Sequence, residues 1–221
     1  ADVVCCSIQD DMQIVRPVSR AEAADISRYF NGVDDAGFLQ PAFMKGCNRE
    51  SVTRSIRLDT LSDGYQVDRL SSSAGAYYSD VHIARVGSLR GAGWQFQQRE
   101  SLNERQARGV FRQQVFLKNP FVAWLPNPPA WRGRRQTFGL RSAQRQSRTG
   151  YFPYRELTVE ESARFCARDR KRLPFAEDFL DVSGEGAPEK PWRYHPLQGH
   201  RLLKLLDSAE LKLRRWLPGN T

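Results

Sequence analysis

Four cysteines are the side chains of this 221-residue sequence with the clearest capacity for redox chemistry. Cys5 and Cys6 are adjacent, and none of the four belongs to a C-x-x-C pair. The count fits a reduced protein or one with up to two disulfides. Because adjacent residues rarely bridge each other, we expect Cys5 and Cys6, if both are oxidised, to pair with Cys47 and Cys166. An exported, oxidising setting is favoured, since the Ala-Asp-Val-Val start resembles a chain whose signal peptide has been removed.

The three histidines do not form a metal-binding pattern. His195 and His200 lack the spacing of zinc ligands on a helix and have no cysteine or acidic partner close by, while His82 lies in a candidate strand. The sequence also contains no Ser/His/Asp order, glycine-rich phosphate loop or paired-carboxylate pattern. We therefore predict no catalytic residue, no metal and no cofactor, which favours a protein that is not an enzyme.

Charge is concentrated in the middle of the chain. The formal net charge is +9, and residues 86–150 alone hold 12 Lys or Arg against 2 Asp or Glu. Arginine outnumbers lysine by 28 to 6, and its planar guanidinium suits bidentate contact with carboxylates and phosphates. The candidate partner- or anion-binding residues lie in segment 124–148: Trp124, Trp131, Arg132, Arg134, Arg135, Arg141, Arg145 and Arg148.

Three interpretations of this basic segment stay open. The first is a solvated loop that binds nothing. The second is a surface for an acidic protein partner. The third is a site for nucleic acid or another polyanion, because arginine with exposed aromatic residues is typical of a groove for single strands.

Two helix starts are signalled by capping boxes, in which a hydroxyl residue and a glutamate three positions later bond reciprocally. Ser19 with Glu22 predicts a first helix that ends near Asn31-Gly32, and Thr158 with Glu161 predicts a second. The expected packing face of the second helix comprises Val159, Ala163, Cys166 and Ala167.

A C-terminal helix is predicted from about His200 to Leu217. Its leucines recur at helical spacing, and basic residues surround them. Such a helix could lie on a membrane, dock into a partner's groove or pack on its own domain, and we expect the last. The residues of this apolar stripe are Leu202, Leu206, Ala209, Leu213 and Trp216.

The middle of the chain indicates strands from 53 to 116. Alternation around the Ser62-Asp63-Gly64 turn predicts a hairpin, residues 81–83 a short strand, and residues 94–97 a further alternating segment. Residues 119–131 contain four prolines and are expected to form a long loop, and residues 133–150 to be largely exposed. No run of apolar residues is long enough to span a bilayer.

Residues 157–192 carry one family resemblance. They contain a helix with a Phe-Cys pair at 165–166, Lys-Arg-Leu-Pro at 171–174, Phe-Ala-Glu-Asp-Phe at 175–179 and Pro-Trp at 191–192. This pattern is similar to the formylglycine-generating-enzyme, or sulfatase-modifying-factor, domain. Residues 85–94 and 137–141 resemble two other segments of that family, a Gly-Gly-Ser-Trp segment and a closing strand, but in the reverse order along the chain.

The resemblance implies an α+β, C-type-lectin-like fold with a short twisted antiparallel sheet, few helices and long loops, in circularly permuted order. It also implies core positions for Ala163, Cys166, Phe175 and Phe179. The family's oxidase members bind Cu(I) through a cysteine pair, and residues 94–112 contain no cysteine, so that chemistry is not carried over.

These observations predict a single domain over residues 1–221, with an N-terminal helix and loops (1–50), a strand-rich basic part (51–150) and a helical part (151–221). We expect a non-enzymatic accessory or scaffold protein of a bacterial envelope assembly, of the secretion or transfer type, periplasmic or secreted, that binds a protein partner through loops and arginines. The alternatives are a nucleic-acid or polyanion binder using residues 124–148, a divergent metal-dependent enzyme, and a cytoplasmic location.

Overall fold

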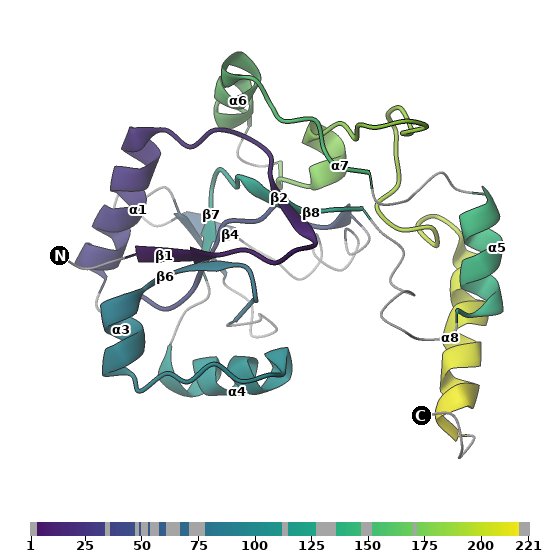
Figure 1. Ribbon diagram of the computed structural model, residues 1–221, viewed down its shortest axis with the longest axis horizontal. Coiled ribbons are helices and arrows are strands. Elements are labelled where there is room, and N and C mark those ends of the chain that lie inside the picture. Colours follow the sequence, from purple (N-terminus) through teal and green to yellow (C-terminus); the bar gives the residue numbers. More distant parts are fainter. Residues whose placement is uncertain are drawn as a thin grey trace. The chain divides into compact units, whose positions relative to one another are not determined.

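The computed structural model describes residues 4–33, 36–46, 49, 53, 58–60, 67–70, 78–111, 115–126, 136–146, 152–169 and 172–216 (Figure 1). The chain divides into two units. Unit 1 comprises Ala1–Met44, Asn48–Trp124 and Glu156–Pro174, and unit 2 comprises Lys45–Cys47, Leu125–Arg155 and Phe175–Thr221.

The described strands and helices confirm the α+β class. The strands are β1 (Val4–Ser7), β2 (Met12–Ile14), β3 (Leu39–Gln40), β4 (Leu58–Thr60), β5 (Val67–Leu70), β6 (His82–Arg85), β7 (Val115–Leu117) and β8 (Val122–Trp124). The helices are α1 (Arg20–Gly32), α3 (Val86–Gly91), α4 (Glu100–Val110), α5 (Phe138–Gln146), α6 (Val159–Cys166), α7 (Ala176–Phe179) and α8 (Arg201–Trp216).

The main sheet of unit 1 is mixed, in the order β1-β6-β3-β7-β5-β4. Strand β3 is antiparallel to β6 but parallel to β7, with Leu39 opposite both Ile83 and Val115. A parallel pair needs a long crossover, and the chain between β3 and β7 supplies it. The predicted antiparallel sheet is therefore wrong at this pair. Strands β2 and β8 form a separate antiparallel pair.

Helices cover both faces of the main sheet in unit 1. Ile83 belongs to the core cluster that includes Tyr29 and Phe30 of α1. Its neighbour Ala84 belongs to the opposite cluster, with Leu89 of α3 and Ala107 of α4. Successive residues of a strand face opposite sides of the sheet, so β6 contributes side chains to the hydrophobic clusters on both faces. Figure 1 shows α1 on one side of β1 and β6 and α3 with α4 on the other.

Two arginines hold the loop between β7 and β8. Arg16, only 1% exposed, donates to the carbonyl oxygens of Asn119 (2.5 Å) and Pro120 (2.9 Å) and pairs with Glu22 at 2.7 Å. Arg168 donates to the Lys118 carbonyl (2.6 Å) and the Asn119 side chain (3.0 Å). These bonds satisfy carbonyls that the loop could not pair by itself.

Several predicted elements of unit 1 are confirmed. Both capping boxes are present, at Ser19 with Glu22 and at Thr158 with Glu161. The hairpin around residues 61–66 is confirmed by its flanks, because β4 and β5 pair antiparallel, while its turn lies outside the described residues. The short strand predicted at 81–83 is β6, displaced by a residue or two.

Other predictions for unit 1 are wrong. Residues 94–97 are not a strand but lead into α4, and β8 lies inside the stretch expected to be loop. In α6, Ser162 and Phe165 are buried, whereas Val159 and Ala163 are exposed and Cys166 is half-buried. The large Phe165 ring, 5.0 Å from that of Phe43, determines which face packs. Helices are also more frequent in residues 51–150 than expected, with α3, α4 and α5 there.

Unit 2 is built from short segments around aromatic side chains. Tyr154 and Val182 form an isolated antiparallel bridge, and the Tyr154 and Trp192 rings lie 5.8 Å apart. The Trp192 indole donates to the Leu180 carbonyl at 2.9 Å. Of the two phenylalanines expected in the core, Phe175 is buried and Phe179 is half-buried. The C-terminal helix is confirmed as α8, and α5 lies against it (Figure 1).

Candidate functional site

The predicted basic segment contains a helix, α5, that the sequence analysis did not anticipate. The Thr137 hydroxyl accepts the Leu140 backbone N–H at 3.1 Å, and the Thr137 carbonyl accepts that of Arg141 at 3.1 Å. The first bond satisfies a backbone donor that a helix start leaves unpaired, and the second is the first i→i−4 hydrogen bond of the helix. The closing strand that the resemblance implies for residues 137–141 is wrong, because α5 begins there.

Helices α5 and α8 pack against each other although α6 and α7 lie between them in the chain. This pair, residues 136–146 and 201–216, is called the α5–α8 hairpin, and its close packing depends on one glycine. A Cβ atom at Gly139 would lie 2.6 Å from the Leu203 carbonyl oxygen and 3.0 Å from the Asp207 nitrogen. The backbones of the two helices therefore meet at Gly139. Leu140 and Ala143 are buried beside this contact in a cluster with Leu197 and Leu203.

Both acidic residues of α8 accept hydrogen bonds from the start of α5. Asp207 accepts the Thr137 hydroxyl at 2.5 Å, and Glu210 accepts the Phe138 N–H at 2.7 Å. The Phe138 hydrogen bond, together with Arg214 and Arg141, lowers the pKa of Glu210 against the opposing effect of burial. Carboxylates at a helix N-terminus are favoured by the helix dipole. The anionic groups of the hairpin thus lie at its internal seam.

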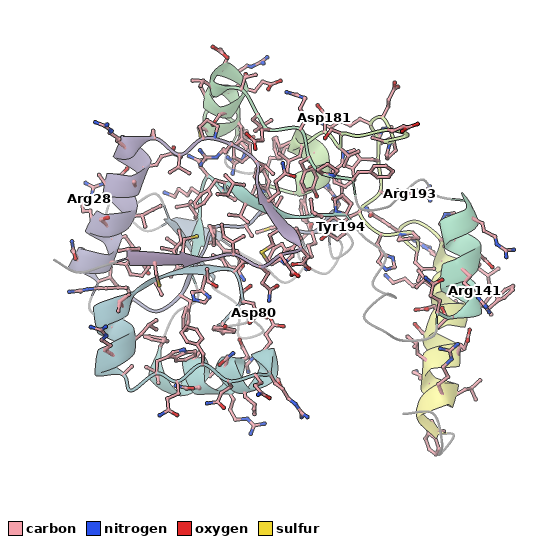
Figure 2. All side chains as sticks on the ribbon, viewed as in Figure 1. Arg28, Asp80, Arg141, Asp181, Arg193 and Tyr194 are labelled. Carbon is pink, nitrogen blue, oxygen red and sulfur yellow. The ribbon has the colours of Figure 1, made fainter. Side chains whose placement is uncertain are left out.

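The outer side of α5 is basic and aromatic. Arg141 and Arg145 are exposed, and Phe138 is 61% exposed. Spacings of three, four and seven residues place the three side chains on one face. Figure 2 labels Arg141 on this helix. The sequence contains no Asp or Glu between Glu104 and Glu156, so neither α5 nor the chain on either side of it supplies an anion.

The other predicted binding residues lie elsewhere or outside the description. Trp124 belongs to β8, opposite Met12, and packs half-buried against the core of unit 1. The structure therefore brings together Arg141 and Arg145 from the predicted set and adds Phe138. Five of the predicted residues lie outside the described part of the chain: Trp131, Arg132, Arg134, Arg135 and Arg148.

The described cysteines do not form disulfides. Cys5 and Cys6 are consecutive residues of β1, opposite Ala84 and Ile83, and neither they nor Cys166 is cross-linked. Cys47 lies outside the described residues. Burial and the neighbouring Cys5 raise the pKa of the Cys6 thiol. A raised pKa leaves less thiolate, which is the reactive form of cysteine.

The histidines have local hydrogen-bonding roles. The His82 ring lies 2.8 Å from the Ser79 carbonyl, and burial lowers the pKa of its imidazole. His195 accepts the Leu197 N–H at 3.0 Å, and burial lowers its pKa as well. His200 lies 2.6 Å from an Arg193 nitrogen. Within the described residues, no three His, Cys, Asp or Glu side chains are grouped as metal ligands.

The apolar stripe of α8 is exposed, contrary to the expectation that it packs on its own domain. Leu202 (71%), Leu213 (64%) and Trp216 (85%) are largely open, as is Leu205 (68%) beside them. The half-buried side chains are those one residue further along, Leu203, Asp207, Glu210 and Arg214. Three of these four side chains hydrogen-bond to the start of α5 or to the Gln136 carbonyl just before it, and Leu203 packs in the cluster with Leu140 and Ala143.

Among the described helices, none combines the length and the apolarity that a membrane crossing requires. Comparison of the chain with protein-family models, with curated proteins and with solved structures finds no match.

Proposed function

We propose that the chain is a non-enzymatic accessory or scaffold protein that binds an acidic protein partner through the outer face of α5. The observation that carries this proposal is the arrangement of charge in the α5–α8 hairpin. The carboxylates of α8 bond to the start of α5, whereas Arg145 and Arg141 stand exposed beside Phe138.

The chemistry of this face suits a protein surface with carboxylates. Arginine donates in a planar fork that matches a carboxylate, and it is enriched at protein interfaces together with aromatic residues. Phe138 offers an apolar anchor on the same helix face as both arginines. A helix provides a rigid base for such a set, so little ordering is needed on binding.

The wider setting of this function is also a proposal. That setting is a bacterial envelope assembly, with the chain periplasmic or secreted. The C-type-lectin-like, sulfatase-modifying-factor kinship is a prediction that rests mainly on residues 157–192 and secondarily on residues 85–94.

The experiment places a photo-crosslinking analogue, p-benzoylphenylalanine, at Phe138 in the native host. Irradiation should give one protein adduct, identified by mass spectrometry. Arg141→Glu with Arg145→Glu should abolish that adduct, because a reversed charge repels an acidic surface. The matched control is Arg90→Glu with Arg105→Glu, which reverses two exposed arginines of α3 and α4 and should leave the adduct unchanged.

Two outcomes would overturn the proposal. An adduct that persists in the Arg141→Glu, Arg145→Glu variant would exclude these arginines from the interface. An adduct with nucleic acid, together with oligonucleotide binding that weakens steeply with salt, would favour the polyanion alternative.

A further inference from the structure

The exposed surface of α8 combines leucines with cations and no anion. Its apolar stripe is open, and the neighbouring Arg201, Lys204 and Lys212 are exposed as well. Both acidic residues of the helix are directed to α5 instead. Within the described side chains of α8, every exposed charge is therefore positive.

Helical spacing separates these three surfaces. Leu203, Asp207, Glu210 and Arg214 form the inward face, and the stripe repeats the same spacing one residue earlier, so it lies about 100° around the helix. The exposed cations occupy the remaining side, where Arg201 and Lys212 border the stripe and Lys204 lies farther round the helix. A leucine and tryptophan face bordered by lysine and arginine is the pattern of a helix that lies in a membrane interface.

We propose that α8 binds the surface of an anionic lipid bilayer, lying parallel to it with the apolar stripe inserted between the headgroups. Charge complementarity identifies this occupant, because the cations beside the stripe would meet lipid phosphates. Each such cation near an anionic surface increases partitioning by about fivefold. This inference uses a different face of the hairpin from the proposed partner contact and does not depend on it.

A second copy of the chain fits the stripe less well. The stripe, from Leu202 to Trp216, covers only two heptads, or about 21 Å of helix, whereas coiled coils are recognised by three or more. Pairing two stripes would also bring Lys212 of each copy toward that of the other, and these two cations repel at low salt.

The test measures co-sedimentation of the full chain with vesicles of phosphatidylcholine containing about 30% phosphatidylglycerol. Wild type should bind these vesicles and bind less as salt is raised. Leu213→Glu should reduce partitioning about tenfold or more, since a leucine that inserts into the bilayer is replaced by a charge. Leu205→Glu should act in the same way. Both residues are exposed, so neither substitution removes packing within the fold.

Matched controls separate this effect from a general change in charge. Val159→Glu alters an equally exposed apolar residue of α6 in unit 1 and should bind like wild type. Trp216→Phe should still bind the vesicles but should lose the blue shift of tryptophan fluorescence that we expect wild type to show on binding.

Three results would overturn the proposal. Wild type could fail to bind the anionic vesicles, or Leu213→Glu could bind as wild type does. Sedimentation equilibrium could instead show a dimer that Leu213→Glu converts to a monomer, which would assign the stripe to a second copy. None of these results changes what is expected of the crosslinking experiment at Phe138, so each proposal can be refuted without the other.

Discussion

The α5–α8 hairpin is the part of the molecule on which both proposals depend, and Gly139 offers a direct test of its geometry. Gly139→Ala would place a methyl group 2.6 Å from the Leu203 carbonyl oxygen and 3.0 Å from the Asp207 nitrogen. Both are backbone atoms, so no side chain can rotate away. Because non-bonded atoms pack at about 3.5 Å, the helices would have to separate by about 1 Å.

The size of the effect follows from two opposing contributions. A gap of this width forfeits a quarter to a half of the dispersion attraction between the facing side chains, and overpacked contacts cost about 1–3 kcal/mol. Alanine gains up to about 1 kcal/mol over glycine in a helix. The overpacking is the larger contribution, so we expect Gly139→Ala to destabilise the hairpin by about 1 kcal/mol or more.

The matched variant is Gly109→Ala in α4. Gly109, like Gly139, lies one position inside a helix end, and nothing lies within 4 Å of a Cβ atom there. Gly109→Ala should therefore be neutral or stabilising. The difference between the two variants isolates the close approach of α5 to α8.

Hydrogen exchange is the suitable assay, because two units need not unfold together. Amides of peptides covering 136–146 and 201–216 should exchange about tenfold faster in Gly139→Ala for each 1.4 kcal/mol lost. Gly109→Ala should leave those peptides unchanged. If amides in 136–146 and 201–216 exchanged as slowly in Gly139→Ala as in wild type, the backbone contact at Gly139 would be refuted.

Two further predictions concern the arginine clamps of unit 1, meaning Arg16 (paired with Glu22) and Arg168, which hydrogen-bond the loop between β7 and β8. Burial opposes ionisation of Glu22, but the hydrogen bonds from Arg16 and Ser19 outweigh burial and lower the pKa of the carboxyl group. The ionised Glu22 therefore stabilises the fold above pH about 4.3, and this stabilisation is lost as the pH falls through the lowered pKa of the folded state. Urea titrations of wild type and Glu22→Gln should therefore differ at pH 7 and converge toward pH 3; a constant difference would contradict the pairing. Arg168→Ala should cost about 1–3 kcal/mol, since it leaves the Lys118 carbonyl without this donor, whereas Arg164→Ala on the exposed side of α6 should be nearly neutral; equal effects would refute the clamp.

Local signals explain which elements could be predicted from the sequence. The capping boxes at Ser19 and Thr158 involve side chains three residues apart, so the sequence contains the whole interaction. The alternation on either side of residues 61–66 is equally local, and β4 and β5 pair as expected. The parallel pairing of β3 with β7 joins segments about 75 residues apart, which no local pattern encodes.

The helix α5 was missed because its signals are weak without its partner. Only Leu140 is a large apolar residue on its packed face, and Gly139 lowers its helix propensity. The glycine is needed for the close approach of α8, and Asp207 and Glu210, some 70 residues later, bond to its first turn. A weak helix former in isolation thus becomes a helix through tertiary contacts.

The orientation of α8 follows from a competition that composition alone misrepresents. The stripe predicts burial of Leu202 and Leu213, and burying a leucine is worth about 1.5–3 kcal/mol. Packing that face on α5, however, would turn Asp207 and Glu210 away from the Thr137 hydroxyl and the Phe138 N–H that they accept. The small surface of α5, with Gly139 and Ala143 at its centre, could cover only part of the stripe. The hairpin therefore satisfies its polar groups internally and leaves the leucines for an external surface, which is why the sequence could identify the stripe but not the direction that it faces.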